Sequence, residues 1–499
     1  MSYPIEFAEQ NPWWTSKQWM ANDKHIQAFQ SSTFQWIPRL KFFLDFKKDT
    51  VYTLRGPRQV GKTTFLKLLI AEKLDGKVPP QNVFYYACDL VDNPKELASI
   101  IEKYLNARRV RRDKDRLYLF LDEVSSVKGW QKGVKFLVDK GTLRNTTVIL
   151  SGSHSLDLRV SAEQLPGRRG EPESNPDLVF VPVKFAEYAE STDENIRQTI
   201  RSLDLLRTEK RHGEIASLSQ GMISSQLEKL GYETARTNIL LDKYLMTGGI
   251  PRPINEFSKS GKISEMTYRT YVDVVKGDLT RYGMNENYLR QILEQLLKTV
   301  GSPVGWSTLR KGTDVASSNT IENYVTALDA SFVLNFFYRM NAPERKPEYA
   351  KEKKVIFSDA FFYHALNGWV HGKDPFDYSI DTLKSPVKKS ILVEQVVGEH
   401  CIRLAYSMAR QKQLFEYKRH VMFWRGKEAR EVDFVIANNS DVIPIEVKFQ
   451  DRVFRDDLYP LADFRKISAT TDGIILSRDI LAKRDGYSIV PASVFLLLI

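Results

Sequence analysis

Residues 56–64 combine the residue types and the spacing that bind a nucleoside triphosphate. They read GPRQVGKTT and fit the P-loop pattern G-x-x-x-x-G-K-[ST]. In this pattern the backbone N–H groups of a glycine-containing loop cradle phosphate oxygens, the lysine reaches the terminal phosphates, and the next hydroxyl holds Mg²⁺. We therefore predict ATP and Mg²⁺ as cofactors. The predicted ATP-binding residues are Gly56, Pro57, Arg58, Gln59, Val60, Gly61, Lys62, Thr63 and Thr64.

A pair of acids completes a hydrolytic site with this loop. Residues 117–121 form a continuous apolar run that is followed by Asp122 and Glu123. Beside bound phosphates, Asp122 would orient Mg²⁺, shared with Thr63, and Glu123 would polarise the water that attacks the γ-phosphate. Acids commonly terminate strands, so the pair is informative because the P-loop lies about sixty residues upstream. We predict Lys62, Asp122 and Glu123 as the catalytic residues.

Three further residues are candidates for contacts with the γ-phosphate. The apolar run at residues 147–150 ends in SGSH, where Ser153 is the preferred sensor residue; the alternative is a simple turn. Arg168 and Arg169 follow in a Gly- and Pro-rich loop and are candidates for a charge-stabilising arginine, supplied in cis or by a neighbouring subunit. Such arginines more often merely coat a loop.

A second constellation lies near the carboxyl terminus. Residues 430–450 read REVDFVIANNSDVIPIEVKFQ, the pattern of a β-hairpin whose turn lies in NNSD. A two-residue turn there places Asp433 directly opposite Glu446, with Cβ atoms about 5 Å apart. Two carboxylates at that distance suit a divalent cation. Lys448 projects from the same face as Glu446, and Glu394 on an upstream helix is a candidate to complete the set.

The elements that must position the first site are alternating apolar strands and amphipathic helices. Strand-like runs cover residues 51–54, 82–89, 117–121, 147–150 and 178–183, and the segments after the first two have helical spacing. This alternation predicts an α/β fold with a parallel, doubly wound sheet that binds its ligand at the carboxyl ends of the strands.

Composition restricts the class of protein. A chain of 499 residues is too long for one core, and its 42% hydrophobic and 27% charged residues are typical of globular proteins. The net charge of +11 favours polyanionic partners, with nucleic acid before membrane. Cys88 and Cys401 lie in apolar surroundings without zinc spacing, as buried thiols of a reducing compartment do. Because neither a leader-like start nor a membrane-length apolar run is present, we expect a cytoplasmic protein.

The region downstream of the sheet is predicted to be helical and then to follow the order of a winged helix. Residues 285–365 show helix, turn, helix and a strand pair, and Asn319 with Glu322 caps the presumed recognition helix. That helix exposes Asn319, Thr320, Asn323 and Thr326 but no Arg or Lys. Phosphate attraction supplies most nucleic-acid binding energy, so protein contacts are the alternative role.

Several motifs together resemble a known family. GPRQVGKTT, LFLDEVSSVKGW, the strand that ends in SGS, GR ahead of VPVKFAEY, and YLMTGGIPRP at 244–253 look like archaeal and bacterial AAA-type ATPases with a winged-helix segment and a nuclease-like carboxyl-terminal domain. Asp433 with Glu446 and Lys448 resembles the PD-(D/E)XK motif of restriction-endonuclease-like folds, with Val432 in place of the proline.

The resemblance covers nearly the whole chain and implies its division. It implies an N-terminal helical segment at 1–50, a P-loop ATPase core at 51–185, a helical lid at 186–280, a winged-helix-like domain at 281–380 and a nuclease-like α/β domain at 381–499. The nuclease site that the resemblance implies consists of Glu394, Asp433, Glu446 and Lys448. Analogy with AAA-type enzymes also suggests a homo-oligomeric ring.

Three functions follow as hypotheses. The first is an ATPase that moves or remodels DNA, including branched or recombination DNA, with ATP hydrolysed at Lys62, Thr63, Asp122 and Glu123. The second is a nucleotide-gated switch that binds protein partners. The third is a metal-dependent nuclease regulated by ATP.

Overall fold

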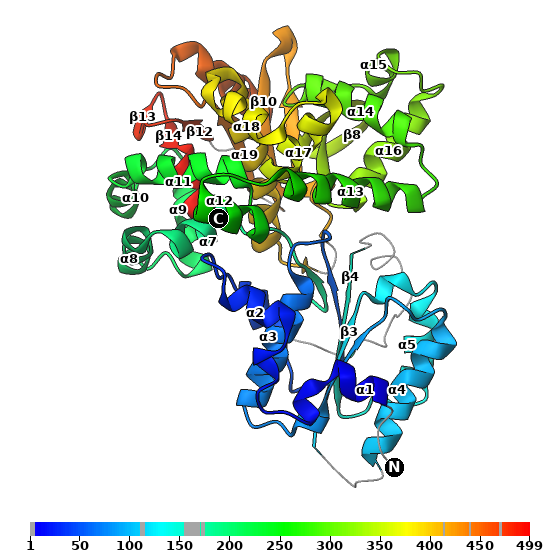
Figure 1. Ribbon diagram of the computed structural model, residues 1–499. Coiled ribbons are helices and arrows are strands. Elements are labelled where there is room, and N and C mark those ends of the chain that lie inside the picture. Colours follow the sequence, from blue (N-terminus) through cyan, green and yellow to red (C-terminus); the bar gives the residue numbers. More distant parts are fainter. Residues whose placement is uncertain are drawn as a thin grey trace. The chain divides into compact units, whose positions relative to one another are not determined.

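A computed structural model of the protein describes residues 5–109, 115–153, 170, 175–412, 415–438, 441–468 and 472–499. The chain divides into two compact units (Figure 1). The first unit spans Met1–Val181 with Ala330–Phe332, and the second spans Pro182–Asp329 with Val333–Ile499. Every helix among the described residues is too short or too polar to cross a bilayer. Both cysteines are buried free thiols, as their apolar surroundings predict.

The first unit is built on a five-stranded sheet in which every strand pair is parallel. Its order is β2-β3-β4-β1-β5, so the predicted parallel α/β sheet is confirmed. The strands are β1 (Thr50–Arg55), β2 (Val83–Ala87), β3 (Leu117–Asp122), β4 (Thr146–Gly152) and β5 (Asp177–Val179). Strands β1 and β3 flank β4, and this places the segments that follow these three strands at one edge of the sheet.

Helices cover both faces of this sheet because successive strand residues point to opposite sides. Helix α3 (Lys62–Asp75) packs on the face that contains Phe120 and Ile149. Helices α4 (Pro94–Arg109) and α5 (Trp130–Asp139) pack on the other face, against Leu119 and Leu121. The apolar runs of the strands are thus buried on both sides, as parallel sheets require.

The aromatic N-terminal segment packs against this sheet and covers its edge. It contains α1 (Ile5–Gln10) and α2 (Lys24–Gln30). Asn11 brackets the edge strand, since its Nδ2 donates to the Tyr85 carbonyl at 2.9 Å and its Oδ1 accepts from the Tyr85 N–H at 2.7 Å. The Trp13 indole donates to the Val83 carbonyl at 3.1 Å. These side chains satisfy backbone groups of β2 that an exposed edge would leave open.

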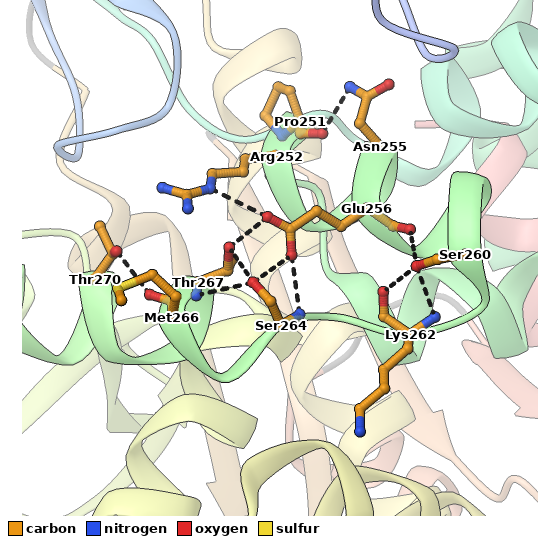
Figure 2. Close-up of polar contacts among 10 residues, drawn as sticks. All are labelled: Pro251, Arg252, Asn255, Glu256, Ser260, Lys262, Ser264, Met266, Thr267 and Thr270. Carbon is orange, nitrogen blue, oxygen red and sulfur yellow. Dashed lines mark hydrogen bonds and ion pairs between the residues drawn. The ribbon is translucent and has the colours of Figure 1, made fainter.

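The second unit begins with a helical region, as the sequence predicts. Its helices are α7 (Phe185–Thr192), α8 (Glu194–Ser202), α9 (Thr208–Ser219), α10 (Ser225–Gly231), α11 (Thr234–Thr247), α12 (Pro251–Ser260) and α13 (Glu265–Arg281). Figure 2 shows how one carboxylate fastens α12 to α13. Glu256 accepts from the N–H and hydroxyl of Ser264, both at 3.0 Å, and from the Thr267 hydroxyl. Burial opposes this charge, but the hydrogen bonds outweigh it and lower the pKa of Glu256.

The GGIP motif is a buried turn between α11 and α12 that requires its glycines. Gly248 has φ +62°, and a Cβ on it would lie 1.8 Å from Oδ1 of Asp359. The Gly249 N–H donates to Oδ2 of Asp359 at 2.8 Å, and the Gly249 carbonyl accepts from the Val183 N–H at 2.7 Å. Burial raises the pKa of Asp359 to about 7, although this hydrogen bond acts in the opposite direction. The two glycines are therefore explained by the packing of this turn against Asp359 in the second unit.

The region 286–357 supplies three strands of a nine-stranded sheet. Its elements are α14 (Glu286–Thr299), β6 (Pro303–Val304), α15 (Trp306–Lys311), α16 (Ser318–Ala330), β7 (Leu334–Asn341) and β8 (Lys346–Phe357). Strand β8 pairs antiparallel with both β6 and β7. The sheet order is β13-β14-β12-β11-β10-β9-β7-β8-β6, so these strands are continuous with those of the carboxyl-terminal region through the contact of β7 with β9.

The carboxyl-terminal region supplies the rest of this sheet and its helices. The helices are α17 (Ala360–His371), α18 (Pro375–Lys384), α19 (Pro386–Met408), α20 (Tyr417–His420), α21 (Tyr459–Ser468) and α22 (Ala492–Leu497). The strands are β9 (Val421–Arg425), β10 (Glu431–Asn438), β11 (Asp441–Val447), β12 (Ile474–Ser477), β13 (Ala482–Arg484) and β14 (Tyr487–Pro491). Strands β9, β10 and β11 form an antiparallel meander, and β12 runs parallel to β11.

Candidate functional site

The P-loop connects β1 to the N-terminus of α3, the place where helix N–H groups attract anions. Two glycines make this turn possible. A Cβ on Gly56 would lie 2.0 Å from the Phe180 carbonyl oxygen, so a side chain there would displace the backbone. Gly61 caps α3 with φ +107°, a conformation that favours glycine. The glycines in the motif therefore have direct steric reasons.

The Lys62 ammonium lies inside the loop. Its Nζ donates to the carbonyls of Gly56 at 2.9 Å and Pro57 at 2.8 Å, and to the Ser153 hydroxyl at 3.0 Å. The side chain is buried. Of the other predicted loop residues, Val60 packs into the core beside α3, whereas Gln59 is exposed. The loop is therefore held in a compact shape around the lysine.

Asp122 is the polar centre of the strand ends. Its Oδ2 accepts from the hydroxyls of Thr63 at 2.7 Å and Tyr85 at 3.0 Å, and its Oδ1 accepts from the Ser151 hydroxyl. Burial, reinforced by the Asp122 charge, raises the pKa of Tyr85, so that phenol stays a hydrogen-bond donor. Thr63 and Asp122, the two residues that the sequence assigns to Mg²⁺, are therefore in direct contact.

Glu123 lies beside the predicted sensor residue. Its Oε1 accepts from the Ser153 hydroxyl at 2.6 Å, and its Oε2 accepts from the Ser153 N–H at 3.2 Å. Glu123 itself has φ +50°, an uncommon backbone conformation that directs the chain away from β3 at this point. Ser153 therefore joins the two catalytic candidates Lys62 and Glu123 through one hydroxyl.

Sequence reasoning missed two residues of this site. Tyr85 on β2 and Ser151 on β4 both donate to Asp122, and each lies on a strand adjacent to β3. Their contact with Asp122 depends on the order of the strands in the sheet, which cannot be read from the sequence. The arginine candidates Arg168 and Arg169 lie outside the described residues.

The second candidate site lies on the hairpin of β10 and β11, whose register confirms the predicted pairing. Phe434 pairs with Ile445, so Asp433 faces Glu446 one position further along. The Asp433 N–H donates to Oε2 of Glu446 at 3.3 Å, and Oε1 of Glu446 contacts the Lys448 ammonium. The turn at 439–440 lies outside the described residues.

A lysine that the sequence did not single out lies among these acids. Nζ of Lys354 on β8 is 2.7 Å from Oδ1 of Asp433, 2.6 Å from Oε1 of Glu394 and 2.9 Å from Oε1 of Glu431. The Lys354 side chain is fully buried. We call Lys354, Glu394, Glu431 and Asp433 the lysine cluster. Only the three-dimensional pairing of β8 with the rest of the sheet reveals it.

Opposing effects set the ionisation of this cluster. Burial lowers the pKa of Lys354, but the surrounding carboxylates outweigh it and raise that pKa well above its ordinary value. Burial likewise opposes the charge of Asp433, yet the Lys354 ammonium lowers the pKa of Asp433. At Glu446 burial prevails, together with the nearby Asp433 charge, and raises the pKa. The lysine cluster therefore contains a firmly protonated ammonium and an ionised Asp433.

The first unit has the features of a P-loop nucleotide-binding domain. These are a parallel sheet, a P-loop that leads into a helix, and an acid pair at the end of β3, which β4 separates from β1. The comparison with protein families agrees. Residues 48–189 match a family described as AAA domain, so this region is similar to AAA-type ATPase domains. Residues 238–372 and 389–495 match two domains of unknown function, DUF8612 and DUF4143.

Solved structures offer only distant similarity. The Walker-type ATPase PABY2304 of Pyrococcus abyssi is 13% identical with a TM-score of 0.37, over 64% of this chain and 91% of that one. The Aeropyrum pernix ORC1 protein in complex with DNA is 13% identical with a TM-score of 0.29, over 66% and 88%. A Thermotoga maritima RuvB variant is 17% identical with a TM-score of 0.25, over 59% and 82%. The chain matches no curated protein.

Proposed function

We propose that the first unit binds and hydrolyses ATP. The observation that carries this proposal is the convergence of Lys62, Ser153 and Glu123 in one hydrogen-bonded chain beside the P-loop. A lysine that donates to carbonyl and hydroxyl oxygens can exchange them for phosphate oxygens, which are stronger acceptors because they are charged. The α3 N-terminus adds favourable N–H dipoles for the same phosphates.

The residues present fit a magnesium ion bound with ATP. The Thr63 hydroxyl lies 2.7 Å from Asp122 Oδ2, so two hard oxygen donors already meet beside the loop, the ligand type that Mg²⁺ prefers. When bound with ATP, Mg²⁺ supplies neutralisation of phosphate charge. Tyr85 and Ser151 hold the Asp122 carboxylate in place by donating to it.

The remaining step is activation of the attacking water, which we assign to Glu123. A carboxylate accepts a hydrogen bond from water and orients its lone pair toward the γ-phosphorus. Ser153 holds both carboxylate oxygens of Glu123 through its N–H and its hydroxyl. The same hydroxyl accepts from Lys62, so Ser153 is suited to sense whether a γ-phosphate is present.

Thr63 allows a sharp test of this assignment. Thr63→Ala removes the hydroxyl that meets Asp122, whereas Thr63→Ser keeps it as a matched control. We expect Thr63→Ala to lower Mg²⁺-dependent ATP hydrolysis by the full-length chain by about 10²-fold or more, since one preorganised charge-stabilising contact is lost. Thr63→Ser should stay near the wild-type rate. Equal hydrolysis by all three proteins would refute the proposal.

We further propose that DNA is the partner on which this ATPase acts. The order α14-β6-α15-α16-β7-β8, with β6 paired to β8, supports the winged-helix interpretation, and the net charge of +11 favours a polyanion. Helix α16 contains no Arg or Lys, so phosphate contacts would fall to other elements such as the exposed lysines of β8. A motor or remodelling role follows if DNA accelerates hydrolysis.

The DNA proposal is tested by measuring the ATPase rate with single-stranded, duplex and branched DNA, and the affinity for each at increasing salt. Counterion release predicts that affinity falls steeply with salt. Stimulation by one DNA form would support a motor. Unchanged hydrolysis and salt-independent binding would instead favour the nucleotide-gated protein switch, for which the absence of Arg and Lys from α16 is the supporting observation.

A further inference from the structure

The PD-(D/E)XK resemblance implies a divalent cation at Asp433 and Glu446. The contacts of their carboxylate oxygens show whether these residues are arranged to bind such a cation. Oδ1 of Asp433 is engaged by the Lys354 ammonium at 2.7 Å, and its Oδ2 accepts from the Val447 N–H at 2.8 Å. Oε1 of Glu446 contacts Lys448, and its Oε2 accepts from the Asp433 N–H. Both oxygens of both acids therefore have donors from the chain itself.

Lys354 is held in this position by its strand. Its backbone lies in the middle of β8, paired with Phe337 of β7 on one side and with Pro303 of β6 on the other. The Nζ also lies 5.1 Å from the centre of the Phe434 ring, which closes the cluster on that side. Withdrawal of the ammonium would leave three carboxylates close together without a cation, which is electrostatically unfavourable.

A metal ion would have to compete with this ammonium for the same oxygens. Mg²⁺ needs carboxylate oxygens at about 2.1 Å in near-octahedral geometry and keeps several waters. In this cluster the Nζ atom of Lys354 already occupies the space between the carboxylates. A dication placed beside a protonated lysine would also be repelled by it. Across the described residues, moreover, no group of three or more His, Cys, Asp or Glu side chains is arranged to hold a metal ion.

We propose that Lys354 is the resident cation of this acid cluster, in the place where a nuclease of this motif would bind its divalent metal. The Lys354 ammonium then offsets part of the negative charge of Glu394, Glu431 and Asp433 from within the same unit. Without a bound dication, neither a metal-activated water nor charge stabilisation of a phosphate is supplied here. The cluster thus fastens β8 to α19 and β10 and does not cleave DNA.

The proposal is tested by Mn²⁺ titration of the full-length chain, followed by electron paramagnetic resonance without nucleotide. Wild type and Asp433→Asn should bind the same number of Mn²⁺ ions with the same affinity, because the wild-type cluster takes none. An Mn²⁺ site that is present in the wild type and lost in Asp433→Asn would overturn the proposal. This comparison does not depend on the ATPase site, which is identical in both proteins.

Removal of the ammonium gives the complementary test. Lys354→Met should gain one Mn²⁺ site, absent from the Lys354→Met/Asp433→Asn double variant, and Mn²⁺ should raise its melting temperature. Lys353→Met is the matched control, since Lys353 is the neighbouring buried lysine of β8 but lies 5.2 Å from the Trp306 ring centre. A folded Lys354→Met protein that gains no site would contradict the exclusion of metal by the ammonium. If that variant does not fold, the wild-type comparison with Asp433→Asn still decides.

Discussion

Two buried lysines show how differently one side chain can be used in the two units. Lys62 donates to two backbone carbonyls and one hydroxyl at the end of the parallel sheet. Lys354 is surrounded by the carboxylates of Glu394, Glu431 and Asp433. Both are buried; Lys62 belongs to the P-loop motif, and Lys354 lies beside Asp433 of the second motif. Their partners, and not their burial, separate the lysine that we propose binds phosphate from the one that we propose is structural.

The difference follows from what each lysine gains by changing partners. A carbonyl or hydroxyl oxygen is replaced by a phosphate oxygen with a gain in hydrogen-bond strength. A buried ion pair is different, because removing one member leaves an uncompensated charge at a cost of several kcal/mol. The comparison therefore predicts that the same substitution at the two lysines changes different properties of the protein.

The largest expected effect is on hydrolysis by Lys62→Met. Loss of the ammonium removes the positive charge that we propose contacts the terminal phosphates, and we expect the ATPase rate to fall by about 10² to 10³-fold. Lys354→Met should keep the wild-type rate per folded molecule. The measurement is steady-state phosphate release by both variants at saturating ATP. Similar losses in the two variants would break the distinction between the lysines.

The second effect is on the free energy of unfolding, and here Lys354→Met should have the larger effect. Lys354→Met leaves the buried Asp433 and the half-buried Glu394 and Glu431 without their cation, so we expect a loss of about 3 to 5 kcal/mol in the unfolding free energy of the second unit. Lys62→Met should cost much less, since it removes hydrogen bonds to neutral oxygens. Denaturant unfolding of the full chain, followed by probes in each unit, measures both. A larger loss for Lys62→Met would contradict this account.

Ser153 sharpens the comparison within the first unit. Ser153→Ala removes the hydroxyl that joins Lys62 to Glu123, and the loss of one or two ordinary hydrogen bonds corresponds to a decrease in kcat of about tenfold. Ser153→Thr, which keeps the hydroxyl, is the control. Rates are compared at saturating ATP, so that a change in binding is separated from a change in turnover. Wild-type kcat for Ser153→Ala would mean that Ser153 only forms a turn.

Asp359 is a buried acid outside the lysine cluster, and its ionisation should make the stability of the protein depend on pH. Its folded-state pKa of about 7 lies above the ordinary 3.8, because burial disfavours the charge. The folded state keeps a proton that the unfolded state has already released, so stability should fall as the pH rises from about 4 to 7, by at most about 1.4 kcal/mol per pH unit. Asp359→Asn cannot ionise and should show a flatter pH dependence in urea unfolding. Identical pH slopes for the two proteins would exclude this ionisation.

The first site was largely predictable because its determinants are local. A glycine turn, a lysine at a helix start and an acid pair after an apolar strand each occupy a short segment. Lys62 and Glu123 both contact Ser153, and Asp122 contacts Thr63. Tyr85 and Ser151 were not predictable, since their role depends on the lateral order of the strands.

The second site shows the limit of the same reasoning. The hairpin register follows from turn position alone, so the juxtaposition of Asp433 and Glu446 was predictable. Lys354 comes from β8, which precedes Asp433 by about eighty residues, and its approach depends on how β7 and β9 join two parts of one sheet. Sequence alone thus predicted the acids Asp433 and Glu446 but not the Lys354 ammonium that pairs with Asp433.

The central claim, that Glu123 activates water for ATP hydrolysis in the first unit, is tested most directly by comparing binding and turnover in one variant. Glu123→Gln keeps the size of the side chain but removes its charge. We predict that the full-length variant binds ATP with Mg²⁺ at wild-type affinity, measured by calorimetry, while its phosphate release falls to background. Hydrolysis at the wild-type rate by Glu123→Gln would contradict the assignment of this site.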